Sequence, residues 1–292
     1  MRFAKAFAPA HITGFFQICD RVKDFRKIGS RGAGVCLSKG AVTHVEVEKY
    51  RAGKIEIFVN NKRSRAEVTR KVAEELAGNQ NVNVRIKTAL YFPISQGLGM
   101  SAAGALSTAL ALNDALELKL EFKEVVEAAH KAEIACRTGL GDVIAQSIGG
   151  FEIRERPGLS PLGTIKRLNW DAGSKIVICV IGKEISTKSI LTNVNWRRSI
   201  NVCGMRLIEK LAQKPTVANF FELSYDFACS TKLATQNIIR AIEKARNYGL
   251  AAQAMLGNTV FAVGNTKKLV DTLKQFGTVY ISTIGTRAKL LT

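Results

Sequence analysis

The clearest pattern along the chain is the alternation of Val82, Val84 and Ile86 with polar residues, which predicts a strand. This strand runs towards Pro93. From about 101 to 116, apolar residues at helical spacing cover most faces, which predicts a buried helix. A strand, a glycine-rich loop and a buried helix therefore follow one another here.

Weaker patterns predict the other elements. An N-terminal strand is expected to break at Pro9, and strands at 42–48 and 55–59 are expected to form a hairpin around a turn at 51–54. Further helices are expected over 65–77, 122–137, 196–213, 217–229, 234–248 and 266–276, and further strands over 175–181, 259–263 and 278–283. Because the pattern restarts after Gly149-Gly150, two domains are predicted, at 1–155 and 156–292.

The composition is that of an ordinary folded protein, with 47% hydrophobic and 23% charged residues. No apolar run approaches the roughly 20 residues of a membrane span, and Lys5 interrupts the N-terminal apolar stretch before it reaches signal-peptide length. The six cysteines show no metal-binding spacing and are expected to be reduced thiols, with disulfides as the alternative. We therefore expect a cytoplasmic protein without a membrane partner; a homodimer is left open.

The formal net charge is +19, and both halves of the chain contribute to it. Nucleic-acid-binding proteins usually concentrate their basic residues in a patch with interleaved aromatic residues, whereas the densest stretch here, 21–31, holds five. No nucleic-acid partner is expected. The charge fits steering of anionic substrates equally well, and a basic RNA-binding module stays a remote alternative.

The glycine-rich loop, Pro93 to Gly104, has the composition of a polyphosphate site. Glycines let backbone N–H groups approach an anion, and the start of the following helix attracts phosphate. Ser101 adds a hydroxyl for phosphate or metal. The loop is neither a Walker loop nor a dinucleotide fingerprint, and a tight turn before a core helix is the alternative. The residues expected to bind phosphate are Gly97, Leu98, Gly99, Met100, Ser101, Ala102 and Ala103.

Two carboxylates follow this loop. Glu133 falls within the apolar stripe of the helix at 122–137, opposite a polar face that includes His130, so its carboxylate is expected to point into the interior or a cleft. A salt bridge at the edge of the stripe is the alternative. Asp142 opens a short apolar segment that Gly149-Gly150 closes, where an ordinary helix cap is the alternative to a catalytic role.

The string PISQGLGMSAAG resembles the second signature motif of the GHMP kinases. APAHITGFF at 8–16 resembles their first motif, with His11 where mevalonate kinases have a lysine, and AMLGNTVFAV at 254–263 resembles part of the third. The resemblance implies an α+β fold of two domains, the N-terminal one like ribosomal protein S5 and the C-terminal one ferredoxin-like. It also implies that ATP and Mg²⁺ are bound, with Ser101 and Glu133 as metal ligands and Asp142 as the catalytic base.

Two further blocks, GSRGAGVCLSKGAVTHV at 29–45 and MLGNTVFAVG at 255–264, resemble the archaeal pantoate kinases of this superfamily. That resemblance implies phosphorylation of the primary hydroxyl of pantoate in coenzyme A biosynthesis. A kinase for another small alcohol, such as homoserine, mevalonate or shikimate, is the alternative. Since pantoate carries a carboxylate, a cation or N–H donors should meet it, and the candidates are His11, Ser30 and Arg31 of a loop at 29–34, and Arg154.

Overall fold

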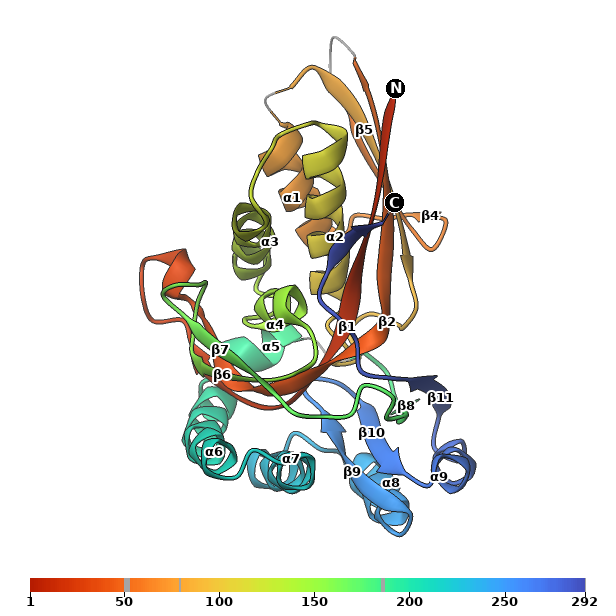
Figure 1. Ribbon diagram of the computed structural model, residues 1–292. Helices are drawn as coiled ribbons and strands as arrows, with labels where there is room; N and C mark the ends of the chain where they lie inside the picture. The colour runs from red at the N-terminus through yellow and green to blue at the C-terminus, as the bar shows by residue number, and fades with distance from the viewer. Residues whose placement is uncertain (50–52, 79, 185–186, 292) are drawn as a thin grey trace.

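The computed structural model describes residues 1–49, 53–78, 80–184 and 187–291, which form two sheets with helices packed on them (Figure 1). The large sheet has the strand order β12-β1-β2-β5-β3-β4, and β6 and β7 extend it from β2. Its strands are β1 (Arg2–Cys19), β2 (Gly29–Lys49), β3 (Ile55–Val59), β4 (Lys62–Arg63), β5 (Val82–Leu90), β6 (Phe151–Arg156), β7 (Thr164–Leu168) and β12 (Lys289–Leu291).

The helices α1 (Glu67–Ala77), α2 (Met100–Ala115), α3 (Phe122–Cys136) and α4 (Asp142–Ile148) gather on one side of the large sheet (Figure 1). The central one, α2, packs on β1 and β2 and also contacts α1, α3 and α4. It is apolar on nearly all faces and almost wholly buried, as its sequence predicts. The start of α2 is thereby held deep in the molecule beside the two longest strands.

The second sheet has the order β11-β8-β10-β9, with all neighbours antiparallel. Its connectivity, strand to helices to hairpin to helix to strand, is the ferredoxin-like arrangement that the sequence resemblance implies. Its elements are β8 (Ile176–Val180), α5 (Thr187–Thr192), α6 (Val194–Gln213), α7 (Val217–Thr231), α8 (Gln236–Arg246), β9 (Gly249–Ala254), β10 (Thr259–Gly264), α9 (Thr266–Leu273) and β11 (Thr278–Ser282).

Two strands that follow residue 156 belong to the large sheet rather than to the second one. β7 pairs with β6, and β12 pairs with β1 from Lys5 to Phe7. The chain thus returns twice to the N-terminal part, and the division at 155/156 stays a prediction. Within the described residues, no helix has the length and apolar character needed to cross a bilayer. The six cysteines are free thiols, as expected.

Three expectations about the first strands are wrong. β1 continues through Pro9, which pairs with Gly40 and is followed by a bulge. Proline has no backbone N–H to donate to the sheet, and a bulge is a position where this is tolerated. The segment at 29–34 is the start of β2, not a loop. The expected hairpin of 42–48 and 55–59 does not form either, because β5 lies between β2 and β3 and pairs with both. Part of its expected turn at 51–54, namely 51–52, lies outside the described residues.

His130 is also placed differently from the sequence prediction. It was expected on the polar face of its helix but is fully buried, and its Nε2 lies 3.0 Å from the backbone oxygen of Ile28. The segment that leads into β2 contacts the helix on that side, so one ring nitrogen of this buried histidine meets a backbone acceptor there. The remaining stripe, including Val125, Val126 and Ala129, is buried as predicted.

Candidate active site

The start of α2 is built as an anion-binding turn. Gly99 is the N-cap of the helix, and no side chain caps the helix. Gly97 and Gly99 have φ values of +73° and +60°, a conformation that favours glycine. An added Cβ at Gly97 would lie 2.7 Å from the oxygen of Ala254, so the loop also packs closely against the segment that precedes β10. The uncapped N–H groups and the positive end of the helix dipole suit a phosphate group.

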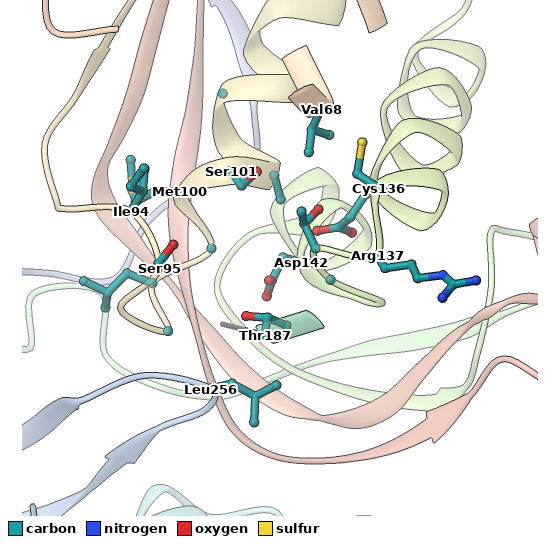
Figure 2. A pocket seen from close by; sticks show the side chains of 18 of the residues that line it. Val68, Ile94, Ser95, Met100, Ser101, Cys136, Arg137, Asp142, Thr187 and Leu256 are labelled. Carbon is teal, nitrogen blue, oxygen red and sulfur yellow. The ribbon is translucent and has the colours of Figure 1, made fainter. Parts of the chain in front are cut away.

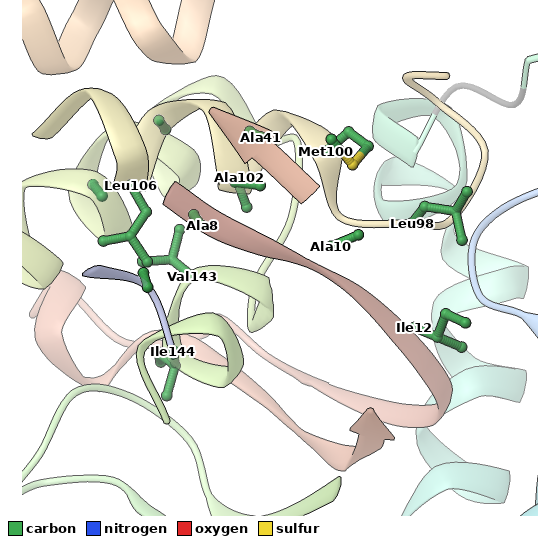
Figure 3. Close-up of a cluster of buried hydrophobic side chains, with 14 of the residues drawn as sticks. Ala8, Ala10, Ile12, Ala41, Leu98, Met100, Ala102, Leu106, Val143 and Ile144 are labelled. Atoms are coloured by element: carbon green, nitrogen blue, oxygen red, sulfur yellow. The ribbon is translucent and has the colours of Figure 1, made fainter. Parts of the chain in front are cut away.

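Apolar contacts fix this turn from behind (Figure 3). Leu98 and Met100 are buried in the same cluster as Ala10 and Ile12 of β1, and the backbone N–H of His11 donates to the oxygen of Leu98 at 3.0 Å. Met100, which stands where the family motif has a serine, is therefore a core residue. The exposed hydroxyl at the start of the helix is that of Ser101.

A cleft of about 550 Å³ opens in front of the turn (Figure 2). Of the seven residues expected to bind phosphate, all but Ala103 line it, together with Glu133, Asp142 and Ser30. Ser101 and Asp142 reach the same space from α2 and α4 (Figure 2). The sequence did not single out several further residues of the wall, namely Thr13, Glu67, Thr69, Thr138, Thr187 and Lys188.

Glu133 carries a carboxylate into the wall of this cleft. Its exposed fraction is 1%, and its Oε2 has no hydrogen-bond partner among the described residues. Burial, and after it the nearby charge of Asp142, raise the pKa of Glu133 well above its usual value. A buried carboxyl oxygen without a donor costs free energy in folding, and a cation bound in the cleft would meet it. Glu133 is thus buried within the stripe rather than at its edge, and its Oε2 is paired with no arginine of the described residues.

Asp142 is the first residue of α4, and the N-cap is Gly141. The cap position is taken by a glycine, so Asp142 is not the N-cap residue that the alternative expected. About a quarter of it is exposed, in the wall of the cleft, and its Oδ1 lies 2.7 Å from Nδ1 of His11. Asp142 is thus both accessible to a ligand and held from behind.

The candidates for binding a substrate carboxylate fall into three groups. Ser30 lines the cleft. Arg154 lies buried behind it, with its Nε and Nη2 lacking a partner among the described residues. Arg31 donates to the backbone oxygen of Glu155 and to Gln17, and His11 is fully buried between two carboxylates; neither lines the cleft.

The structure also brings in Glu152, which the sequence prediction missed. Glu152 is fully buried in β6, with Oε1 3.0 Å from Nε2 of His11 and in contact with Nη1 of Arg154. One signal was available in the sequence: Glu152 and Arg154 are two apart in a strand, so they point to the same face. Within the described residues, no group of three or more His, Cys, Asp and Glu side chains is arranged for a metal ion.

Comparison with known proteins identifies the class to which this fold and this turn belong. The GHMP kinases N terminal domain matches residues 64–150, which contain the loop, Glu133 and Asp142. A pantoate kinase from Methanocaldococcus jannaschii is 40% identical over 268 residues, 91% of this chain and 95% of the relative. A pantoate kinase from Thermococcus kodakarensis is 34% identical over 89% of this chain and 87% of its own length.

The solved structures agree with these relatives. A phosphotransferase related to the coenzyme A biosynthesis pathway superposes with a TM-score of 0.89, at 29% identity, over 99% of this chain and 98% of that one. The chain therefore belongs to the GHMP kinases and, among them, to the pantoate kinase family.

Proposed function

We propose that this protein phosphorylates the primary hydroxyl of pantoate with ATP, giving 4-phosphopantoate for coenzyme A synthesis. The observation that carries the proposal is the identity of 40% and 34% with two pantoate kinases along nearly the whole of all three chains. The match to the GHMP kinases N terminal domain, over 64–150, includes the phosphate turn, Glu133 and Asp142. The chemistry of the cleft residues supports the same reaction.

The turn from Gly97 to Ala103 is the proposed site for the phosphates of ATP. Uncapped N–H groups at the start of α2 suit phosphate oxygens. The residues fit a magnesium ion as well: Ser101 offers a hydroxyl, and Glu133 offers a buried carboxyl oxygen that has no other partner among the described residues. Bound magnesium would neutralise charge on the phosphates during transfer, and it would also favour the ionised form of Glu133.

Asp142 is the proposed base. In the reaction the hydroxyl oxygen forms a bond to the γ-phosphorus, the bond from that phosphorus to the oxygen it shares with the β-phosphate breaks, and ADP leaves. An alcohol is far less acidic than a carboxylic acid, so a carboxylate cannot deprotonate it beforehand. It can orient the hydroxyl and accept the proton late, in a loose transition state.

Ser30 and Arg154 are proposed to recognise the carboxylate of pantoate. An added Cβ at Gly141 would lie 2.4 Å from Oγ of Ser30 and 3.0 Å from Nε of Arg154, so these two groups approach the same point behind the cleft wall. A guanidinium with two unpartnered nitrogens beside a hydroxyl matches a carboxylate. His11 and Arg31, which hydrogen-bond elsewhere, receive no carboxylate-binding role in this proposal.

The test is ADP release from ATP and Mg²⁺ with a panel of acceptors: pantoate, homoserine, mevalonate and shikimate. We expect pantoate to give the highest kcat/KM. Higher turnover of another acceptor would replace the substrate while leaving the kinase assignment intact, and the absence of acceptor-dependent ADP would contradict both. Arg154→Lys is the matched variant: it keeps the charge but loses the planar fork, so KM for pantoate should rise more than KM for ATP.

A further inference from the structure

A chain of four charged or polar side chains runs from the cleft into the protein. Asp142 faces the cleft, His11 lies behind it at 2.7 Å, Glu152 lies 3.0 Å beyond His11, and Arg154 contacts Glu152. The last three are at most 2% exposed. They come from β1 and β6, and Asp142 comes from α4, so the first strand meets two consecutive elements that lie more than 120 residues further along the chain.

The two ring nitrogens of His11 each face a carboxylate oxygen. A neutral imidazole has one N–H and can satisfy only one of them, whereas an imidazolium donates to both. Burial lowers the pKa of His11, but the hydrogen bonds with Asp142 and Glu152 outweigh it, and the pKa lies above its usual value. With His11 charged, two cations and two carboxylates balance within the buried chain.

Other groups near His11 do not disturb this balance. Burial raises the pKa of the Cys36 thiol well above its usual value, so this neighbour on β2 stays neutral. Gln146 of α4 donates to the oxygen of Gly99. The charged groups that act on His11 are therefore Asp142 and Glu152 directly, and Arg154 through Glu152.

The start of β2 is shaped to hold this chain. β2 pairs with β6 so that Gly34 lies opposite Glu152 and Gly32 lies opposite Arg154. An added Cβ would lie 2.4 Å from Nε2 of His11 at Gly34 and 3.1 Å from Nη2 of Arg154 at Gly32. The block at 29–34, expected to be a loop, is part of a strand. Its glycines at 32 and 34 leave room for the side chains of His11, Glu152 and Arg154.

His11 also has a second attachment, to the phosphate turn. Its backbone N–H donates to the oxygen of Leu98, while its side chain bonds Asp142. The same residue therefore fixes the spacing between the turn proposed for ATP and the carboxylate proposed as base. Because Oδ1 of Asp142 is engaged with His11, Oδ2 remains to meet a hydroxyl in the cleft.

We infer that His11 is a positioning residue for Asp142: held from behind by Glu152 and Arg154, its Nδ1–H orients the carboxylate towards the acceptor hydroxyl. The inference rests on the proposed kinase function and adds to it a role for two residues that do not line the cleft. A purely structural cluster would be buried in the same way. If His11 positions Asp142, turnover requires the hydrogen bond from Nδ1. If His11 only stabilises the cluster, turnover does not depend on which of its two hydrogen bonds is kept.

Two substitutions separate these hydrogen bonds. The amide nitrogen of Asn can occupy the position of Nδ1, so His11→Asn keeps a donor to Asp142 and loses the reach to Glu152. The amide of Gln reaches the position of Nε2, so His11→Gln keeps the contact with Glu152 and loses the donor to Asp142. We expect kcat of His11→Gln to fall about 10²-fold, the cost of misplacing a reacting group by about 1 Å. His11→Asn should stay within about tenfold of wild type, and KM for ATP should change little in both.

Glu152→Gln is the second measurement, should either His11 variant not fold. Its amide oxygen can take the place of Oε1 and accept from both Nε2 of His11 and Nη1 of Arg154, so both contacts and the Nδ1–H of a charged His11 are kept while the negative charge is lost. We expect a fall in kcat of about tenfold or less, smaller than in His11→Gln.

Equal kcat in His11→Asn and His11→Gln would overturn the inference. So would a fall of about 10²-fold in Glu152→Gln at an unchanged melting temperature. These outcomes leave the proposed function standing, because wild type remains active. If wild type itself forms no acceptor-dependent ADP, the proposed function fails, and this inference fails with it.

Discussion

Gly34→Ala tests the packing around the buried chain at the point where it is tightest. The added methyl carbon would lie 2.4 Å from Nε2 of His11 and 2.4 Å from the backbone oxygen of Ile12. Ordinary contact begins at 3.4 Å, so each of these two separations is 1.0 Å too short, and the ring, the strand or both must move. Backbone in a buried strand pair cannot move freely, and part of the shift is therefore expected in His11.

Two effects should follow. Overpacking of a buried site costs about 1 to 3 kcal/mol of stability, which lowers the melting temperature by about 2 to 4 °C per kcal/mol. A shift of His11 displaces Asp142, and kcat should fall by about 10²-fold while KM for ATP changes little. Turnover, ATP binding and a melting curve should be measured on one preparation, below the melting transition.

Gly173→Ala is the matched control, because its added methyl carbon would meet nothing closer than 3.5 Å, at the carboxylate of Asp171. It should leave turnover unchanged and alter the melting temperature little. If Gly34→Ala keeps wild-type kcat, the spacing between His11 and Asp142 does not limit the reaction, and the reasoning from packing is refuted.

The other predictions concern the two carboxylates and the loop hydroxyl. Asp142→Asn should lower kcat by about 10²- to 10⁴-fold with ATP affinity nearly intact; near-normal turnover in the steady-state assay would contradict the role as base. Ser101→Ala should raise the Mg²⁺ concentration needed for half-maximal activity, and an unchanged titration would contradict the metal role. The pKa of Glu133 is raised in the folded protein, whereas a Glu in the unfolded chain ionises above about pH 4.3. Without metal, the free energy of unfolding should therefore fall as pH rises above about 4.3. Glu133→Gln should therefore melt higher than wild type at pH 7 but not at pH 4, and equal melting temperatures at pH 7 would contradict the burial cost.

Local patterns predicted most helices and several strands of the fold correctly. α1, α3 and β5 show helical or strand periodicity, and α2 is apolar on nearly all faces; all four lie within a few residues of their predicted ranges. The failures involve long-range pairing, which local periodicity does not encode. β5 enters between β2 and β3 because its buried positions Val84, Ile86 and Thr88 make it a central strand, and nothing near the expected hairpin turn reports that competition.

The candidate site divides in a similar way. Residues of the phosphate turn and the two carboxylates were predicted from motifs, and the structure gathers them around one cleft. His11 was a candidate for meeting the substrate carboxylate, because that group calls for a cation or N–H donors. Its partners Asp142 and Glu152 lie 131 and 141 residues away, beyond the reach of local patterns. Only the pairing of β2 with β6 shows that glycines of β2 lie opposite Glu152 and Arg154 and leave room for their side chains.

The pairing of β12 with β1 has a consequence for biosynthesis. This pairing joins Lys5, Ala6 and Phe7 to residues that are synthesised more than 280 positions later, namely Leu291, Leu290 and Lys289. During translation one edge of β1 therefore stays open until residues 289–291 have been synthesised and have left the ribosome. An unpaired edge in a nascent chain invites association with other strands, so a ribosome stalled before residue 289 would release a protein whose large sheet cannot be completed.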